Sequence, residues 1–139
     1  MFKTFSRFAL ISTVLAVSAC VIQPKTDEER VFELAEQRQA ALLEYDFEKA
    51  YQYMSPGYRQ LNTVDKFTSD HMGVYNWESS KVLKATCEED LCEVNVEVVF
   101  DVGMQSGARG RKPEKFLIPR INKETWVRLD NKWWFSKIQ

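Results

Sequence analysis

Three cysteines and a single histidine carry the most distinctive side-chain chemistry of this 139-residue chain. Cys87 and Cys92 flank an acidic turn at 88–91, between two segments with strand-like composition. Cysteines that face each other across an antiparallel pair lie close enough to form a disulfide. Their spacing is not the Cys-x-x-Cys of redox enzymes, and a zinc site needs four ligands where the chain has one histidine, His71. We therefore expect a structural disulfide, which adds about 2 kcal/mol because the loop is short.

Candidate catalytic groups are few. His71 follows Asp70 in a segment with helical character, and adjacent residues on a helix do not face each other, so they form no dyad. We expect His71 to lie at the surface or near a helix cap. The chain has no Gly-rich phosphate loop, no paired Cys/His metal set and no serine-nucleophile motif. We therefore expect no cofactor and no metal, and a non-enzymatic role more than catalysis.

The N-terminus has the features of an export signal. Lys3 and Arg7 precede an apolar run at 8–17, FALISTVLAV. A membrane span needs about 20 apolar residues, whereas the central region of a signal peptide needs about 7–15. The run therefore predicts secretion, and secretion places Cys87 and Cys92 in an oxidising compartment that favours their disulfide.

Residues 17–20, VSAC, resemble the lipobox of bacterial lipoproteins, with Val17 where leucine is commoner. The resemblance implies cleavage before Cys20 and fatty acylation of its thiol. Residues 1–19 would then be the signal peptide and 20–25 a lipid-anchored tether. Val21, rather than aspartate, implies the outer membrane facing the periplasm if the source is Gram-negative. The alternative is an ordinary signal peptide in which Cys20 is incidental.

Charge and size limit the classes of partner. The formal net charge is −1, so no overall basic field favours nucleic acid. The chain after the signal has the size of one domain. A basic cluster remains, formed by Arg109, Arg111 and Lys112. It is either a solvated loop or an electrostatic contact with an anionic partner or lipid headgroup.

Capping signals predict helices in the first half of the secreted chain. Thr26 and Glu29 match the two ends of a capping box. Apolar residues follow at helical spacing, at Val31, Leu34, Ala35, Ala41, Leu42 and Tyr45. Asp46 is the predicted N-cap of a second helix over 47–54, which Pro56 and Gly57 in the segment 55–57 should stop. A half-turn is expected at 58–61. Thr63 is the predicted N-cap of a third helix over 64–72, which Gly73 should end in a left-handed conformation.

Beyond Gly73 the periodicity becomes that of strands, expected over 79–87, 92–103, 114–129 and 132–138. In the second of these, one face carries Val94, Val96, Val98, Phe100 and Val102, with no carboxylate. Pro119 is expected to cause a bulge because proline cannot donate to the ladder. Asp130 and Asn131 suit a two-residue turn with positive φ.

Three segments together resemble the NTF2-like (cystatin-like) superfamily: 45–51 (YDFEKAY), 54–59 (MSPGYR) and 125–133 (TWVRLDNKW). The resemblance covers 26–139 and implies an α+β domain, with N-terminal helices packed on a curved antiparallel sheet that forms a cone. Similar domains serve as enzymes, small-molecule carriers, dimerisation modules and parts of envelope proteins. The function therefore depends on the site and not on the fold.

The turn at 130–131 fixes the pairing of the last two strands. Trp126, Trp133 and Phe135 share one face, and Val127 and Trp134 share the other. The resemblance implies that Trp133 points inward and Trp134 outward. We expect Val127 and Trp134 to form an interface for a second copy or an envelope protein, since tryptophan is common in interface hot spots. The alternative is that another segment of the chain covers Trp134.

Two functions remain open. The first is a membrane-anchored, non-enzymatic binding or assembly module of the cell envelope. The second is a small-molecule carrier or enzyme that uses the cone, with Tyr53, His71, Tyr75 and Trp77 near its mouth. A cone lined by Val, Phe and Trp would favour a small apolar ligand, and a buried acid or histidine would favour catalysis.

Overall fold

The longest helix, α1 (Asp27–Leu43), begins at the predicted cap. The computed structural model describes residues 24–103 and 115–137, so Cys20 and the basic residues Arg109, Arg111 and Lys112 lie outside it. Thr26 Oγ1 accepts a hydrogen bond from the Glu29 amide, and the Glu29 carboxylate accepts one from the Thr26 amide. Among the described helices, none has the length and apolar character of a membrane span.

The buried side of α1 contains two unexpected polar residues, Arg38 and Gln39. Val31, Ala35 and Leu42 are buried as the periodicity predicts. Arg38 lies on the same stripe and is only 3% exposed. Tyr45 lies past the helix end with φ 59° and is exposed, so the apolar stripe is shorter than expected.

Three short helices and a 3-10 turn follow: α2 (Phe47–Gln52), α3 (Pro56–Leu61), α4 (Val64–Asp70) and η1 (Met72–Asn76). Asp46 and Thr63 cap α2 and α4 as predicted. The predicted stop before Pro56 is confirmed, since α2 ends at Gln52. The start of the half-turn predicted over 58–61 is wrong, because Ser55 caps α3 and Pro56 opens it, and proline is favoured in the first helical turn. Gly73 lies inside η1 without positive φ, so its predicted left-handed conformation is also wrong.

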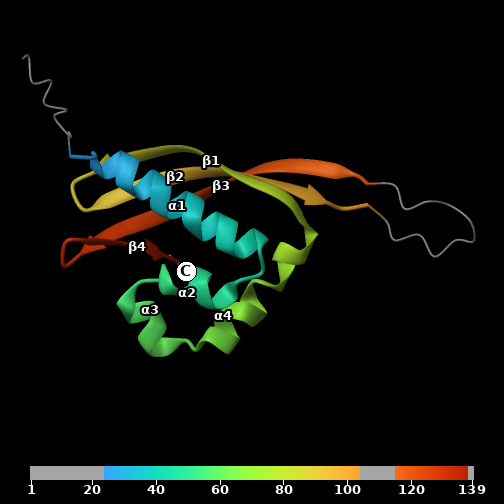
Figure 1. The fold of residues 1–139 in the computed structure, drawn as a ribbon, viewed down its shortest axis with the longest axis horizontal. Coiled ribbons are helices and arrows are strands. Elements are labelled where there is room, and N and C mark those ends of the chain that lie inside the picture. The colour runs from blue at the N-terminus through green and yellow to red at the C-terminus, as the bar shows by residue number, and fades with distance from the viewer. Residues whose placement is uncertain (1–23, 104–114, 138–139) are drawn as a thin grey trace, which may run out of the picture.

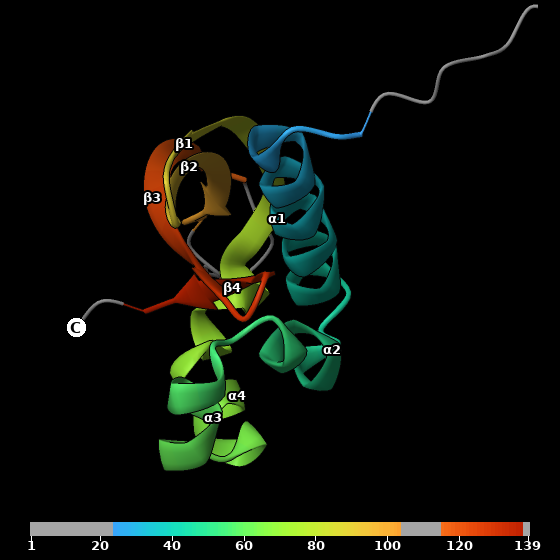
Figure 2. The ribbon, with the colours of Figure 1, turned by 90° about the vertical axis from the view of Figure 1, so that its left-hand side faces the viewer.

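The sheet is antiparallel, in the order β1 (Trp77–Glu88), β2 (Leu91–Asp101), β3 (Leu117–Leu129) and β4 (Lys132–Ser136). It curves around α1, while α2, α3 and α4 gather beyond β4 (Figures 1 and 2). This is the predicted α+β architecture. Val94, Val96 and Val98 face α1 and are buried, whereas Val102 lies beyond the strand end and is exposed.

The predicted bulge at Pro119 is wrong. The register between β2 and β3 is continuous, with Pro119 opposite Val99. β4 pairs with β3 only from Thr125 to Leu129, so Pro119 lies where β3 is an edge and needs no donor on that side. The register shifts occur instead in β1, between Trp77 and Ser79 and between Val82 and Lys84.

The last hairpin has the predicted register, with Val127 opposite Trp134 and Trp126 opposite Phe135. Asp130 and Asn131 have φ 51° and 60°, as the tight turn requires. Trp126 is fully buried and Trp133 nearly so, whereas Trp134 is half-buried on the other face.

Candidate functional site

A polar centre lies inside the cone, between α1 and β3. Arg38 Nη1 donates to Glu124 Oε1 over 2.6 Å, and Gln39 Nε2 donates to the same oxygen over 2.6 Å. Trp126 Nε1 donates to Glu124 Oε2 over 3.1 Å. Ser80 Oγ extends the network to Gln39. Both carboxylate oxygens of Glu124 are therefore engaged.

The Arg38 guanidinium also lies over the ring of Phe135, with 3.8 Å between the guanidinium carbon and the ring centroid. Burial lowers the pKa of Arg38 from its usual value, and Glu124 opposes that shift. An arginine stays charged in proteins, so the centre is an ion pair. The Glu124 carboxylate is therefore held in place by a cation and by two further donors, Gln39 and Trp126.

This centre was not among the features predicted from sequence. The apolar face of β2 carries no carboxylate, as expected for that strand. Glu124 enters instead from β3, two residues before Trp126 and on the same face. Arg38 continues the helical spacing from Val31 and Ala35. The spacing of Arg38 and the position of Glu124 can both be read from the sequence. Only the structure shows that these two residues, 86 positions apart, form an ion pair.

His71 lies at the C-cap of α4, as expected, and is half-buried. Its Nδ1 is 2.7 Å from the carbonyl of Phe67, and its ring stacks on the Phe67 ring. A carbonyl can only accept, so Nδ1 carries the hydrogen and Nε2 is the acceptor in the neutral ring. Burial lowers the pKa of His71. Asp70 binds Lys66 instead, so the two neighbours form no dyad.

The other predicted pocket residues lie apart from His71. Tyr75 stacks on Tyr45 at the surface, with 4.7 Å between ring centroids. Trp77 meets Phe100 edge to face inside the sheet. Tyr53 donates a hydrogen bond to Gln37 on α1. The structure therefore does not gather these four residues into one cavity.

Tyr53 and Trp134 instead meet at a groove outside the cone. This groove, of 470 Å³, lies between α1, the end of α2 and the turn of the last hairpin. Its apolar lining is Leu34, Tyr53, Trp133 and Trp134, its amides are Gln37, Gln52 and Asn131, and its charged residues are Arg30, Glu33 and Lys132. The volume lies within the usual range of about 300–1,000 Å³ for ligand sites.

A larger hollow, of 790 Å³, lies between the start of α1 and β1. Its lining contains one aromatic ring, Phe32, and several charged side chains, including Glu28, Glu29 and Glu36. Aromatic side chains contribute most to recognition sites. The groove is lined by Tyr53, Trp133 and Trp134, of which Trp133 is nearly buried, and it is the better candidate. Among the described residues, no group of three or more His, Cys, Asp or Glu is placed to hold a metal ion.

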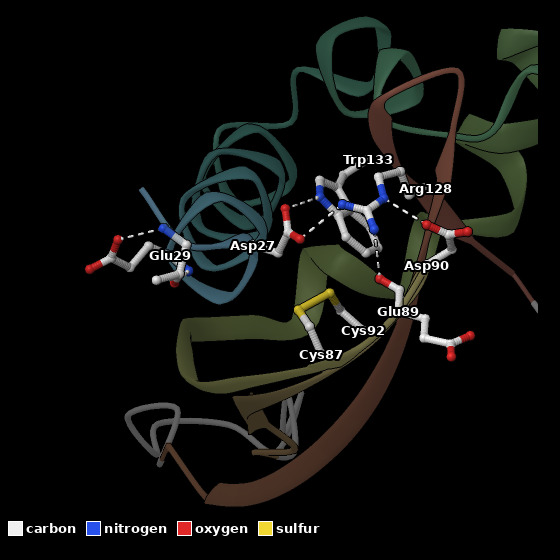
Figure 3. The surroundings of a disulfide bond; sticks show 9 residues. Asp27, Glu29, Cys87, Glu89, Asp90, Cys92, Arg128 and Trp133 are labelled. Atoms are coloured by element: carbon white, nitrogen blue, oxygen red, sulfur yellow. Dashed lines mark hydrogen bonds and ion pairs between the residues drawn. A yellow bond between two sulfur atoms is a disulfide. The ribbon is translucent and has the colours of Figure 1, made fainter. Parts of the chain in front are cut away.

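Arg128, on β3, joins the first turn of α1 to the turn between β1 and β2 (Figure 3). Arg128 binds Asp27 on α1 over 2.9 Å and Asp90 over 2.7 Å, and Nη2 donates to the Glu89 carbonyl. Its guanidinium lies 5.1 Å from the Trp133 ring centroid. The carboxylate of Asp90 is the largest cause that raises the pKa of Arg128.

The predicted disulfide is confirmed beside this cluster. Cys87 and Cys92 lie opposite each other in β1 and β2 and are bonded, with 4.0 Å between their Cα atoms. The bond closes the turn that presents Glu89 and Asp90 to Arg128 (Figure 3). The disulfide therefore also helps to hold the first turn of α1.

The predicted interface residues Val127 and Trp134 are both half-buried. The guanidinium carbon of Arg59, on α3, lies 5.0 Å from the Trp134 ring centroid. Part of this face is therefore covered within the chain, and the rest borders the groove. An interface there remains a prediction.

No protein-family model matches the chain, and no curated protein matches it in sequence. Solved structures do resemble it. One is a SEC-C motif-containing protein from Psychrobacter arcticus, with a TM-score of 0.56 at 16% identity over 94% of this chain and 75% of that one. A second SEC-C motif-containing protein, from Rhodopseudomonas palustris, has a TM-score of 0.50 at 17% identity over 72% and 70%.

A third neighbour is a protein described as an NTF2-like transpeptidase from Campylobacter jejuni, with a TM-score of 0.51 at 14% identity over 76% of this chain and 96% of that one. At these identities the likeness concerns the fold alone. The predicted NTF2-like α+β fold is therefore confirmed, and the descriptions of the neighbours carry no activity over to this chain.

Proposed function

We propose that this protein is a lipid-anchored module of the cell envelope that binds a partner in the groove beside α1 and carries out no chemistry in its cone. The observation that carries this proposal is the contrast between the two sites. Inside the cone, Glu124 is already neutralised by Arg38 and accepts three hydrogen bonds. Outside it, Tyr53, Trp134 and the edge of β4 at Trp133 border an open groove.

Acid–base catalysis in a cone of this kind, as in ketosteroid isomerase, needs a carboxyl group whose surroundings leave it free to exchange a proton or to stay protonated. In this chain both oxygens of the Glu124 carboxylate are already engaged by Arg38, Gln39 and Trp126. A neutralised, hydrogen-bonded carboxylate of this kind supports a structural role. The binding function therefore falls to the outer surface.

The proposed anchor would hold the groove close to the membrane. Residues 20–23 span at most about 14 Å when extended. Arg30 and Glu33 lie within the first two turns of α1, and Asn131 and Lys132 lie at the hairpin turn on the same end of the molecule (Figure 1). A partner in this groove would therefore lie near the surface of the anchoring membrane.

Fractionation tests the anchor. We expect the wild-type protein in the membrane fraction, at the density of the outer membrane in a Gram-negative source, and the Cys20→Ala protein in the soluble envelope fraction. A Cys20→Ala protein that stays with the membrane would rule out anchoring by Cys20.

Photo-crosslinking in cells tests binding at the groove. A photoreactive residue at Gln52, an exposed groove position, should give a discrete product with a partner. The matched control is the same residue at Lys81, which is exposed on β1 and outside the groove. Products from Lys81 alone, or from neither position, would contradict the proposed function.

The groove volume also suits a small molecule, which favours carriage of a small ligand as the second candidate. The same experiment separates the two candidates. A carrier would give no protein adduct from Gln52. Its ligand would remain bound during purification and would appear in the native mass spectrum of the protein.

A further inference from the structure

At the outer edge of β4, the backbone amide and carbonyl of Trp133 form no hydrogen bond with the backbone of residues 24–103 and 115–137, and Trp133 lines the groove. Arg128 pairs with Trp133 across the hairpin, yet the Arg128 amide donates to the Asp90 carbonyl on the opposite side, over 2.8 Å. In an antiparallel sheet, a residue whose amide points to the strand on one side forms no backbone hydrogen bond with the residue opposite it on the other side, so Arg128 and Trp133 are a non-hydrogen-bonded pair. The amide and carbonyl of Trp133 therefore point outward, away from β3.

The next outward-pointing residue shows that this edge accepts an extended segment. The Phe135 amide donates to the Tyr53 carbonyl over 2.8 Å, and the Phe135 carbonyl accepts from the Ser55 amide over 3.0 Å. This short segment runs parallel to β4 and bridges at Met54. It begins at Tyr53, which leaves the stretch of edge at Trp133 open to the groove.

The charges at the groove favour an acidic partner. Arg30 and Lys132 form no ion pair within residues 24–103 and 115–137, whereas the charge of Glu33 is answered by Lys25. The groove therefore has a local excess of positive charge although the whole chain is slightly acidic. Complementary charge at an interface rim promotes encounter and selects the partner.

We propose that an extended, acidic peptide segment of a partner protein pairs with the β4 edge at Trp133 and fills this groove. This inference rests on the proposed binding function and names its partner class. Backbone pairing supplies the affinity, and alternate side chains reach Trp134 and Leu34 on either side. Acidic residues of the segment meet Arg30 and Lys132. The paired donor and acceptor of Trp133 favour a peptide over a glycan, which the amides of Gln37 and Gln52 could also contact.

The test uses the full chain and three peptide probes. The first is a blocked octapeptide that alternates valine with glutamate and threonine. The second is the same peptide with N-methylated backbone nitrogens, which removes its donors. The third carries lysine in place of glutamate. We expect the first to bind and to slow hydrogen exchange at the Trp133 amide, and the other two to bind weakly.

Charge-swap variants sharpen the test. Lys132→Glu should weaken binding of the acidic peptide roughly tenfold and strengthen binding of the lysine peptide. Arg30→Glu should change both affinities in the same direction. Because Arg30 lies on α1, this result would show that the effect of Lys132→Glu does not come from a distorted hairpin turn. Lys81→Glu is the matched control and should change neither affinity.

Three results would overturn this inference: equal binding of the N-methylated peptide, unchanged exchange at Trp133, or saturable binding of chitotetraose in place of the peptide. If Gln52 forms crosslinks in cells while all peptides fail, the proposed function stands and strand addition is wrong. If Gln52 forms none, the proposed function itself fails.

Discussion

Two arginines form the same kinds of contact, an ion pair and an aromatic contact, in two parts of this molecule. Arg38 binds Glu124 and stacks on Phe135, and Arg128 binds Asp27 and Asp90 and stacks on Trp133. The two aromatic residues lie two positions apart on β4. The arginines differ in solvent access, since the side chain of Arg38 is 4% exposed and that of Arg128 is 31% exposed.

Because of this difference, similar contacts should contribute differently to the free energy of unfolding. An exposed ion pair contributes about 0–1 kcal/mol, because water and salt screen it. Breaking a buried pair costs about 3–5 kcal/mol, since one charge is left without its partner in the interior. The interior pair should therefore govern stability, and the cluster at the tether end should govern local order at the start of α1.

The largest expected effect is at the interior pair. Arg38→Met alone should lower the free energy of unfolding by about 3–5 kcal/mol, because Glu124 keeps its charge and loses its cation. The double variant Arg38→Met/Glu124→Gln should recover most of this loss, since no buried charge remains and the amide oxygen can still accept from Gln39 and Trp126. Urea unfolding measures both. A double variant no better than the single one would show that the pair itself, and not the orphaned charge, stabilises the fold.

The next effect concerns the disulfide at the tether end. Cys87→Ser/Cys92→Ser should cost about 2 kcal/mol, because the closed loop is short. Hydrogen exchange should rise first in the turn at Glu89 and Asp90 and in the first turn of α1, which Arg128 joins. Adding a reductant to the variant is the control and should change nothing. Global unfolding of the variant would mean that the disulfide and the turn at Glu89 and Asp90 contribute far more than about 2 kcal/mol to the free energy of unfolding.

The exposed arginine should matter less. Arg128→Met keeps the hydrocarbon stem over Trp133 and should cost less than about 1 kcal/mol, with the difference from wild type vanishing at high salt. Thermal unfolding at low and high ionic strength measures it. A loss as large as that of Arg38→Met would abolish the distinction between the two arginines.

The smallest effect is a pH dependence beside the interior centre. Burial lowers the pKa of His71, the positive charges of Arg38 and Lys137 lower it further, and Asp70 opposes them. The unfolded chain therefore binds this proton more readily, so His71 should reduce stability as the pH falls below about 6.5. Unfolding of wild type and His71→Phe should diverge below that pH and agree above it. Parallel curves would show that His71 stays neutral or exposed in both states.

The same contrast explains what the sequence could predict. The caps at Thr26, Asp46 and Thr63, the turn at Asp130 and the disulfide each follow from a few neighbouring residues, so local rules located them. The start predicted for the next helical turn, at residue 58, was wrong because proline ends one helix and begins another by the same restriction of φ.

The interior pair and the groove depend on how α1 crosses the sheet, and no local pattern encodes that crossing. Arg38 lies on the apolar stripe of α1 and Glu124 shares a strand face with Trp126, but only the approach of helix and strand brings the two charges together. Tyr53 and Trp134 were predicted in separate roles, as pocket and interface, and the structure places both at one groove. Long-range packing therefore decided the candidate site, whereas local chemistry decided the elements.

The central claim is that binding occurs at the groove while the interior pair only supports the fold. The direct measurement is the crosslink yield from Gln52 in cells, in wild type, in Arg38→Met/Glu124→Gln and in Trp134→Ser. We predict an unchanged yield in the interior variant and a strong loss in Trp134→Ser, with both proteins folded and equally abundant. A yield lost in the interior variant and kept in Trp134→Ser would place the function in the cone and contradict the account.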